Sequence, residues 1–304
     1  MPITPTQKIW MNGEFVDWAD AKVHVLSHTL HYGNGAFEGI RCYEAANGPA
    51  VFRLTPHIER LFRSGKILYL NIPYTVADLV GAVKETIRVN DIRECYVRPL
   101  VYLGYGEIGV NPLQSPVEVM IAVWPWGAYL GDEGTQKGVR LMISSWQRHD
   151  PNAMPPAAKG VGMYVNSQMA KIQAVKAGYD EALLLSPQGY VSECTGENIF
   201  VVRNGAIVTP PVAAGALEGI TQDSVRRIAT DLGIEFRFDN LLRSDLYTAD
   251  EMFLSGTAAE IVPVRSVDDR EIGDPGPITR RIQETYAAAV RGQIDRYAEW
   301  CEYV

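Results

Sequence analysis

A lysine and a glutamate carry the chemistry that the sequence suggests first. Lys159 lies among small residues in Pro155–Gly160, where no acidic neighbour in the sequence balances its charge. Schiff-base chemistry needs such an amine, because a desolvated lysine loses its proton more easily. Glu193 ends a short strand pattern, and a carboxylate on rigid backbone can pair with a pyridinium nitrogen. Taken singly, they are better explained as a surface lysine and a hairpin glutamate; together they indicate pyridoxal phosphate.

Three further places in the sequence could bind a phosphate. Gly219–Thr221 begins a predicted helix, where N–H groups and the positive end of the helix dipole point outward. Ser255–Thr257 follows a buried strand pattern, so its N–H groups and hydroxyl could face a ligand. Arg60 lies on a predicted helix and could offer a bidentate guanidinium. A helix cap, a turn and a solvated arginine would explain each alone, but their joint presence favours a phosphorylated cofactor.

Composition and charge exclude several classes of protein. The chain has 304 residues, a formal net charge of -8, 47% hydrophobic and 21% charged residues. A nucleic-acid partner or a polybasic membrane contact would need a basic face, so we expect neither. The segment Met1–Pro5 does not resemble a signal peptide, and the scattered Cys42, Cys95, Cys194 and Cys301 indicate reduced thiols that mostly fill the core. We therefore expect a cytoplasmic enzyme.

Other motifs are better explained by structure than by chemistry. Gly104–Gly109 matches GxGxxG, but Asn111-Pro112 follows, and proline prevents the helix that a dinucleotide site requires. A loop is predicted there instead. His24, His28 and His31 would align only on a helix, whereas the local pattern 22–26 alternates like a strand. No metal-ligand spacing, GxSxG or P-loop motif occurs, so no metal is expected.

The order of elements predicts an α/β (α+β) fold. Asn12-Gly13 and Asn204-Gly205 are hairpin turns between strand patterns. A helix is expected from Thr55-Pro56 onward, with the Thr55 hydroxyl as its cap and proline at its first position. Further helices are expected over about 76–89, over 161–177 from the helical spacing of Val165, Met169, Ile172 and Val175, over 221–232, and from 278 to about 297. The polar, glycine-rich stretch after Trp124 indicates a linker. We expect a small N-terminal α/β domain over 1–127, an interdomain loop over 128–137 and a large C-terminal α/β domain over 138–304.

The chain resembles the fold-type IV pyridoxal-phosphate enzymes and, within them, the branched-chain amino-acid aminotransferases. The resemblance covers nearly the whole chain and runs through HYGNGAFEGIRCY (31–43), YVRPL (96–100), GVNP (109–112), WPWGAYL (124–130), AAKGVGMY (157–164), SECTGENIF (192–200), LEGIT (217–221) and SGTAAEI (255–261).

The resemblance implies roles for individual residues toward the cofactor. Lys159 would link covalently to pyridoxal 5′-phosphate and later move the proton between the substrate Cα and the cofactor C4′. Glu193 would pair with the pyridine nitrogen, with Asn198 in support. The other cofactor contacts would be Tyr164 to O3′, Leu217 against the ring, and Arg60, Ile220, Thr221, Gly256 and Thr257 at the phosphate.

The resemblance also implies how substrate is bound. Thr257 and Ala258 N–H groups, with Tyr96, would hold the α-carboxylate, and Arg98 would meet the distal carboxylate of glutamate or 2-oxoglutarate. Phe37, Trp126, Tyr129 and Tyr164 would line the side-chain pocket, and Tyr32, Ile108 and Val110 would complete it from a neighbouring subunit. A homodimer, or a larger assembly of dimers, is implied.

The implied reaction is transamination between L-leucine, L-isoleucine or L-valine and 2-oxoglutarate. A transaminase of the same fold that acts on a broader range, including D-amino acids or (R)-amines, is the alternative. Both would use Lys159 and Glu193, and Arg98 is the residue that separates them.

Overall fold

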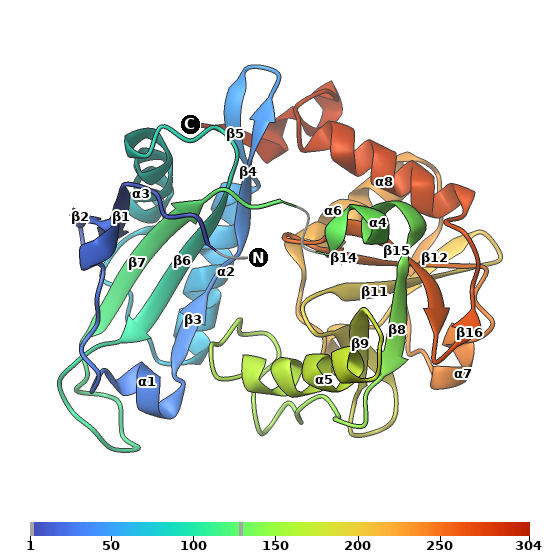
Figure 1. Ribbon diagram of the computed structural model, residues 1–304, viewed down its shortest axis with the longest axis horizontal. Coiled ribbons are helices and arrows are strands. Elements are labelled where there is room, and N and C mark those ends of the chain that lie inside the picture. Colours follow the sequence, from blue (N-terminus) through green and yellow to red (C-terminus); the bar gives the residue numbers. More distant parts are fainter. Residues whose placement is uncertain (1–2, 128–129) are drawn as a thin grey trace. The chain divides into compact units, whose positions relative to one another are not determined.

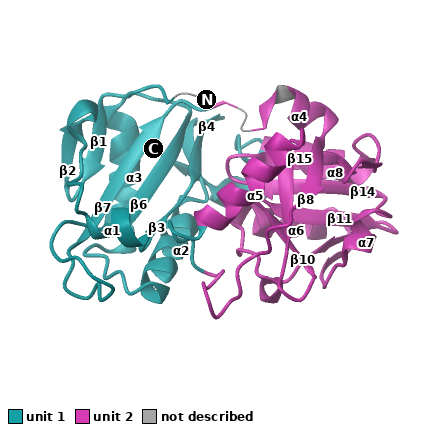
Figure 2. Cartoon of the chain, turned by 60° about the horizontal axis from the view of Figure 1, so that its bottom comes forward, with its two compact units in different colours: residues 1–126, 158–163, 289–304 teal, residues 127–157, 164–288 magenta. Residues whose placement is uncertain are grey.

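The computed structural model describes residues 3–127 and 130–304. Its contacts divide the chain into two compact units (Figures 1 and 2). Unit 1 contains the chain up to Trp126, with Ala158–Met163 and Ala289–Val304; unit 2 contains Gly127–Ala157 and Tyr164–Ala288. Among the described residues, no helix is long and apolar enough to cross a membrane.

Unit 1 is built on an antiparallel sheet with strand order β17-β5-β4-β6-β7-β1-β2, and β3 pairs with β6. Its strands are β1 (Lys8–Met11), β2 (Glu14–Asp17), β3 (Gly35–Phe37), β4 (Ile40–Ala45), β5 (Gly48–Phe52), β6 (Cys95–Leu103), β7 (Val117–Trp124) and β17 (Cys301–Tyr303). Its helices are α1 (His28–Tyr32), α2 (Leu54–Ile67) and α3 (Val76–Val89), with 3-10 helices η1 (Trp18–Asp20) and η3 (Asp295–Trp300). The predicted Asn12-Gly13 hairpin is confirmed, with both residues at positive φ (49° and 99°).

The two faces of this sheet differ because side chains alternate along each strand. On β6, Val97 and Val101 point into a core that also contains Ile58 and Leu61 of α2 and Val83 of α3. Residues one position before or after these valines, among them Tyr96 and Arg98, therefore lie on the opposite face. The period of two in YVRPL thus places an arginine and a tyrosine on the face without these helices.

Unit 2 is built on a mixed sheet with strand order β10-β9-β8-β15-β14-β11-β12-β13, and β16 pairs with β15. Its strands are β8 (Val139–Ile143), β9 (Glu181–Leu185), β10 (Val191–Cys194), β11 (Asn198–Arg203), β12 (Ala206–Thr209), β13 (Phe236–Phe238), β14 (Glu251–Gly256), β15 (Glu260–Val267) and β16 (Arg270–Glu271). Its helices are α4 (Gly131–Lys137), α5 (Tyr164–Lys176), α6 (Ile220–Asp231), α7 (Arg243–Leu246) and α8 (Pro277–Ala289), with 3-10 helix η2 (Val212–Ala214). β11 pairs with β12 through the predicted Asn204-Gly205 turn and with β14 on its other side.

Several predicted elements differ from the structure. α2 begins at Leu54, and the predicted Thr55 hydroxyl cap is wrong: the Thr55 N–H and hydroxyl both donate to the Glu302 carboxylate (2.7 Å each). No strand forms over 22–26, where Val25 and Leu26 are exposed and hydrogen-bond to the nearby His31 and His24 rings, and His28 and His31 instead lie on α1. The final helix ends at Ala289, because Gly292 turns the chain at φ 65° toward η3 and β17.

The region predicted as an interdomain loop is partly helical. Of residues 128–137, Ala128 and Tyr129 lie outside the described residues, and Gly131–Lys137 form α4. The boundaries of the two compact units also differ from those of the predicted domains. Residues 158–163 belong to unit 1, where Gly160 bridges to Ala36 of β3, and β17 near the end of the chain joins the sheet of unit 1. These returns of the chain join residues distant in sequence, which a linear composition pattern does not reveal.

Candidate active site

The backbone of Lys159 is fixed on two sides within unit 1. The Lys159 N–H donates to Ser64 Oγ of α2 (3.0 Å), and its carbonyl accepts from the Phe37 N–H (3.1 Å). The next residue continues this alignment, since Gly160 bridges to Ala36 of β3. The Lys159 Nζ lies 5.1 Å from the centre of the Phe37 ring. A helix and a strand therefore hold the lysine, while its half-buried side chain reaches over an aromatic ring.

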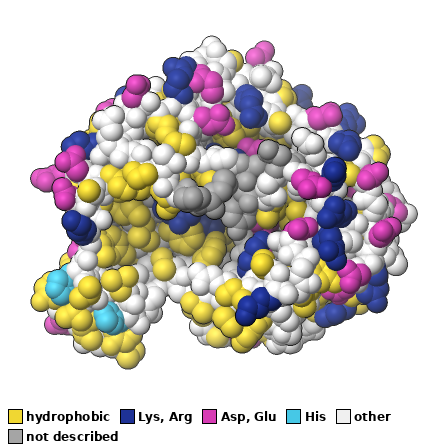
Figure 3. Space-filling model, viewed as in Figure 1, with side chains coloured by type: hydrophobic (Ala, Val, Ile, Leu, Met, Phe, Trp, Pro, Cys, Tyr) yellow, Lys and Arg dark blue, Asp and Glu magenta, His cyan; other side chains and the backbone are white. Residues whose placement is uncertain are grey.

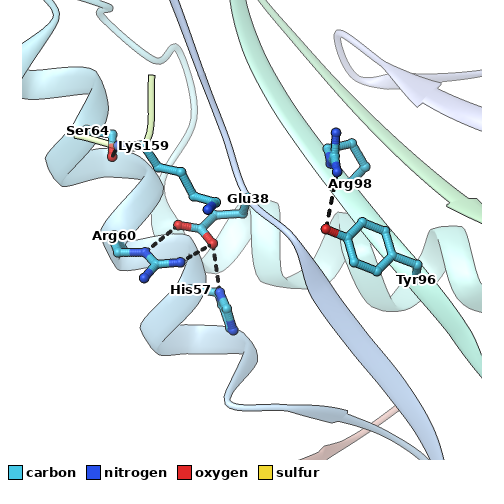
Figure 4. Close-up of polar contacts among 7 residues, drawn as sticks. All are labelled: Glu38, His57, Arg60, Ser64, Tyr96, Arg98 and Lys159. Carbon is cyan, nitrogen blue, oxygen red and sulfur yellow. Dashed lines mark hydrogen bonds and ion pairs between the residues drawn. The ribbon is translucent and has the colours of Figure 1, made fainter. Parts of the chain in front are cut away.

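Arg60 is held by a carboxylate that the sequence analysis did not single out. Glu38, which is fully buried, accepts from Arg60 Nε (2.7 Å) and Nη2 (2.8 Å) and from His57 Nδ1 (2.7 Å). Burial alone would raise the pKa of Glu38, but the charge and hydrogen bond of Arg60, together with His57, hold it well below its ordinary value. Burial lowers the pKa of His57, against the opposing effect of Glu38. Figure 4 shows the Lys159 side chain pointing toward this group.

Arg98 lies among aromatic rings on the face of the sheet away from α2 and α3. Its guanidinium carbon is 4.7 Å from the centre of the Phe37 ring, 5.3 Å from Tyr96 and 6.0 Å from Trp124. Nη2 donates to the Tyr96 hydroxyl at 3.2 Å (Figure 4). The Tyr96 ring also packs edge-on against the Trp126 ring, with 4.3 Å between the ring centres. The structure thus brings together four of the predicted substrate residues: Phe37, Tyr96, Arg98 and Trp126.

In unit 2, Glu193 is held by an arginine and a backbone N–H group. Arg148 pairs with Glu193 Oε1 at 2.6 Å, and the Leu217 N–H donates to Glu193 Oε2 at 2.9 Å. The Leu217 carbonyl accepts from Asn198 Nδ2 at 3.0 Å, and Arg148 Nε donates to the Gly215 carbonyl at 3.2 Å. Glu193, Leu217 and Asn198 therefore form one hydrogen-bonded group.

The start of α6 lies against this group. A Cβ on Gly219 would be 2.0 Å from Asn198 Oδ1, so glycine is needed for the amide to lie there. Gly219 precedes Ile220 and Thr221, the first residues of α6, where helix N–H groups can meet an anion. Asn198 also pairs with Ser255 across β11 and β14, which places Gly256, Thr257 and Ala258 directly beyond it.

These residues fit a phosphorylated pyridine ligand. Unit 2 contains a charged carboxylate, the start of a helix and the end of a strand as a connected group. The buried Ser255 hydroxyl, next to Gly256, has no hydrogen-bond partner in the part of the chain that the structure describes. A buried hydroxyl without a partner is costly, and an acceptor on a ligand would satisfy it.

Besides Glu193, unit 2 contains a second buried carboxyl group, that of Glu197, which keeps its proton near neutral pH. Burial, reinforced by the charge of Glu181, raises the pKa of Glu197 to about 8. Glu181 itself pairs with Lys171 (2.7 Å) and accepts from the Thr195 hydroxyl (2.7 Å). Burial likewise raises the pKa of Cys194 well above its ordinary value, which supports the prediction that this cysteine fills the core.

Three predicted pocket residues are exposed together in unit 1. Tyr32 of α1 and Ile108 and Val110 of the loop between β6 and β7 are exposed, and no helix follows the GxGxxG sequence in that loop. His28 links the two segments: its ring lies 4.6 Å from that of Tyr32, and its Nε2–H donates to the Gly109 carbonyl (2.8 Å). Figure 3 shows apolar side chains gathered around the histidines at the lower left.

The remaining predicted residues are placed as follows. Tyr164 is the first residue of α5 in unit 2, Thr257 and Ala258 lie in the turn between β14 and β15, and Tyr129 lies outside the described residues. α5 itself packs through Ala170 and Ala174, whereas the apolar residues whose spacing predicted it (Val165, Met169, Ile172 and Val175) are exposed.

Comparison with known proteins identifies the family of this chain. The family model described as amino-transferase class IV matches residues 35–267. The chain belongs to the class IV aminotransferases. It is 46% identical over 299 residues to the branched-chain-amino-acid aminotransferase of Escherichia coli (strain K12), covering 97% of each chain.

Solved structures of branched-chain amino acid aminotransferases agree with this assignment. A T.th. branched-chain amino acid aminotransferase with pyridoxamine 5′-phosphate is 51% identical, covers 99% of both chains and has a TM-score of 0.96. The same T.th. protein complexed with N-(5′-phosphopyridoxyl)-L-glutamate is 51% identical, covers 98% of both chains and has a TM-score of 0.94. The protein is therefore an aminotransferase of fold type IV, and the predicted α/β fold is confirmed.

Four residues at the site were not found from the sequence: Glu38, His57, Ser64 and Arg148. A weak signal existed for three of them. Glu38 interrupts an apolar strand pattern, and His57, Arg60 and Ser64 follow helical spacing, which places them on one face of α2. Arg148 gave no signal, because it lies in an irregular segment whose partner, Glu193, comes 45 residues later.

Proposed function

We propose that the protein transfers amino groups between L-branched-chain amino acids and 2-oxoglutarate with pyridoxal 5′-phosphate as cofactor. The observation that carries this proposal is the position of Phe37. The Lys159 amine and the Arg98 guanidinium both lie over its ring, at 5.1 and 4.7 Å. An aromatic, apolar surface beside the amine suits leucine, isoleucine or valine, and the Arg98 cation near the same ring suits the distal carboxylate of glutamate.

The cofactor, when bound, supplies an electron sink that stabilises negative charge at the substrate Cα. Lys159 would link to it and, once released, take and return the proton. Arg148 would keep Glu193 in one orientation, so that its carboxylate meets the pyridine nitrogen. Arg60, Ile220, Thr221, Gly256 and Thr257 would hold the phosphate, with Asn198 and Leu217 supporting Glu193 and Tyr164 at O3′. The pyridoxamine 5′-phosphate bound to the T.th. relative supports this choice.

The substrate would be oriented at both of its ends. Thr257 and Ala258 N–H groups and the Tyr96 hydroxyl would bind the α-carboxylate, which fixes the Cα hydrogen for Lys159. Phe37, Trp126, Tyr129 and Tyr164 would line the side-chain pocket. The phosphopyridoxyl-L-glutamate complex of the T.th. relative supports glutamate as one substrate.

The exposed residues Tyr32, Ile108 and Val110 support a homodimer in which this face of one subunit completes the pocket of its partner. An apolar surface of this kind is unfavourable in water and is expected to be covered. Analytical ultracentrifugation would test this: a Val110→Asp variant should shift toward monomer and lose turnover, and a wild-type protein that is monomeric throughout would refute it.

The substrate proposal is tested through Arg98→Ala. The loss of a charge-assisted hydrogen bond should lower kcat/KM for L-glutamate by roughly 10- to 100-fold and change that for L-leucine little. Arg140→Ala is the control, because Arg140 also lies over a tyrosine ring (Tyr179, 4.8 Å) but at the surface. In this variant, kcat/KM should be unchanged for both substrates. Equal losses for the two substrates in Arg98→Ala would contradict the proposal.

A further inference from the structure

Glu38 is a buried charge for which the proposed reaction gives no role. Its side chain is inaccessible to solvent, and both carboxylate oxygens accept hydrogen bonds from the side chains of α2. A buried carboxylate is costly even when paired, and replacing such a pair by apolar residues is often neutral or stabilising. Stability alone is therefore a weak explanation for Glu38, and its effect on Arg60 is a better one.

The geometry of the pair fixes one edge of the guanidinium. Glu38 binds Nε and Nη2 of Arg60 side-on, at 2.7 and 2.8 Å. A planar guanidinium bound in this way can turn only by breaking two hydrogen bonds. Its other edge, formed by Nη1 and Nη2, then points away from the carboxylate in one direction. That edge is suited to a second bidentate acceptor, such as a phosphate.

His57 completes the arrangement from the same helix. It donates from Nδ1 to the Glu38 oxygen that Nη2 also contacts, and its ring is buried. His57, Arg60 and Ser64 lie on one face of α2, at i, i+3 and i+7, and Ser64 accepts from the Lys159 N–H. The same helix face thus holds the arginine and the backbone of the lysine (Figure 4).

We propose that Glu38 is a positioning residue that orients Arg60 toward the cofactor phosphate, and that His57 holds Glu38 in place. This rests on the proposed function, in which Arg60 binds that phosphate. Through Arg60, Glu38 would act only on the phosphate of a ligand, so this effect should depend on whether the ligand carries a phosphate.

The test compares two ligands on cofactor-free protein. Dissociation constants of pyridoxal 5′-phosphate and of pyridoxal, which lacks the phosphate, are measured by absorbance titration for each variant. The ratio of the pyridoxal constant to the pyridoxal 5′-phosphate constant reports the phosphate contribution alone. Glu38→Gln should lower this ratio by about 10-fold, the lower end of what loss of an orienting partner costs at metal sites, and should leave pyridoxal binding unchanged.

The chain offers a matched control. Glu44 also binds an arginine side-on, since Arg93 donates from Nε and from Nη2 (2.7 Å), but this pair is at the surface. Glu44→Gln should therefore keep the wild-type ratio. Arg60→Met should lower the ratio further than Glu38→Gln, and the double variant should match Arg60→Met, because Glu38 has no route to the phosphate without Arg60.

The outcomes separate the two proposals. A wild-type ratio in Arg60→Met would overturn the phosphate role of Arg60 and with it this inference. A lowered ratio in Arg60→Met with an unchanged or raised ratio in Glu38→Gln would overturn the inference alone; a raised ratio would mean that the carboxylate charge repels the phosphate. If Glu38→Gln also weakens pyridoxal binding, the substitution has perturbed unit 1. The ratio is then measured for His57→Gln: a lowered ratio supports the inference, and an unchanged ratio overturns it.

Discussion

The Arg148 guanidinium and the Glu193 carboxylate form an ion pair of 2.6 Å, and both side chains are about nine-tenths buried. Glu193 also accepts from the Leu217 N–H, so its two oxygens have separate partners within unit 2. Arg148 in turn donates to the Gly215 carbonyl. The carboxylate proposed to meet the pyridine nitrogen is thus held in one orientation by contacts within unit 2.

Arg148→Met should destabilise unit 2, because it leaves the Glu193 charge buried without its partner. Breaking a buried pair from one side costs about 3–5 kcal/mol, whereas removing both charges costs much less. Urea unfolding of Arg148→Met, Glu193→Gln and the double variant measures this. The double variant should be more stable than Arg148→Met; additive losses would show that the pair contributes no coupling.

Lys159→Ala should abolish transamination while leaving the fold intact. The hydrogen bonds that fix this residue to Ser64 and Phe37 come from its backbone, which alanine retains. Turnover with L-leucine and the melting temperature would be measured together, with Lys66→Ala, an exposed lysine of α2, as control. Near-normal turnover in Lys159→Ala would refute its catalytic role.

Gly219→Ala should weaken cofactor binding. The added Cβ would lie 2.0 Å from Asn198 Oδ1, so either the Asn198 amide or the start of α6 must move. Gly81→Ala of α3 is the control, because no atom lies within 4 Å of its Cβ position. Fluorescence titration of the cofactor-free variants with pyridoxal 5′-phosphate measures the effect, and equal affinities in the two variants would contradict it.

Glu197 should make stability depend on pH. Its pKa rises from 4.5 to about 8 on folding, so the folded protein keeps a proton that the unfolded chain has released. Stability from this group is therefore greatest below pH 4.5 and falls as pH rises to about 8. Glu197→Gln should flatten this fall in the free energy of unfolding, and the exposed Glu271→Gln should not. An unchanged slope in Glu197→Gln would show that Glu197 ionises normally.

Local sequence was enough for elements whose signals lie within a few residues. The alternation in YVRPL predicts β6 and puts Tyr96 and Arg98 on one face. The helical spacing of apolar residues predicts a helix over 76–89, and α3 has these bounds. Asn12-Gly13 and Asn204-Gly205 predict their turns because positive φ suits those residues.

The prediction failed where distant segments supply the stabilising contact. Glu302 caps α2 in place of the expected Thr55 hydroxyl. The predicted last helix ends early, at Ala289, and the chain continues through η3 into β17, which pairs with β5. Val23 and Val25 alternate with polar residues as in a strand, yet no neighbouring strand among the described residues pairs with them. Glu38 and Arg148 were missed for the same reason, because a buried ion pair is visible only when both partners are placed.

The most direct test of the proposed transamination is the visible spectrum of the protein loaded with pyridoxal 5′-phosphate, followed after addition of single substrates. L-leucine and L-glutamate should each convert the spectrum to that of pyridoxamine phosphate, and D-alanine and an (R)-amine should not. Arg98→Ala should lose the response to L-glutamate and keep that to L-leucine. Conversion by D-alanine or the (R)-amine as fast as by L-leucine, or no response to L-leucine, would contradict the account.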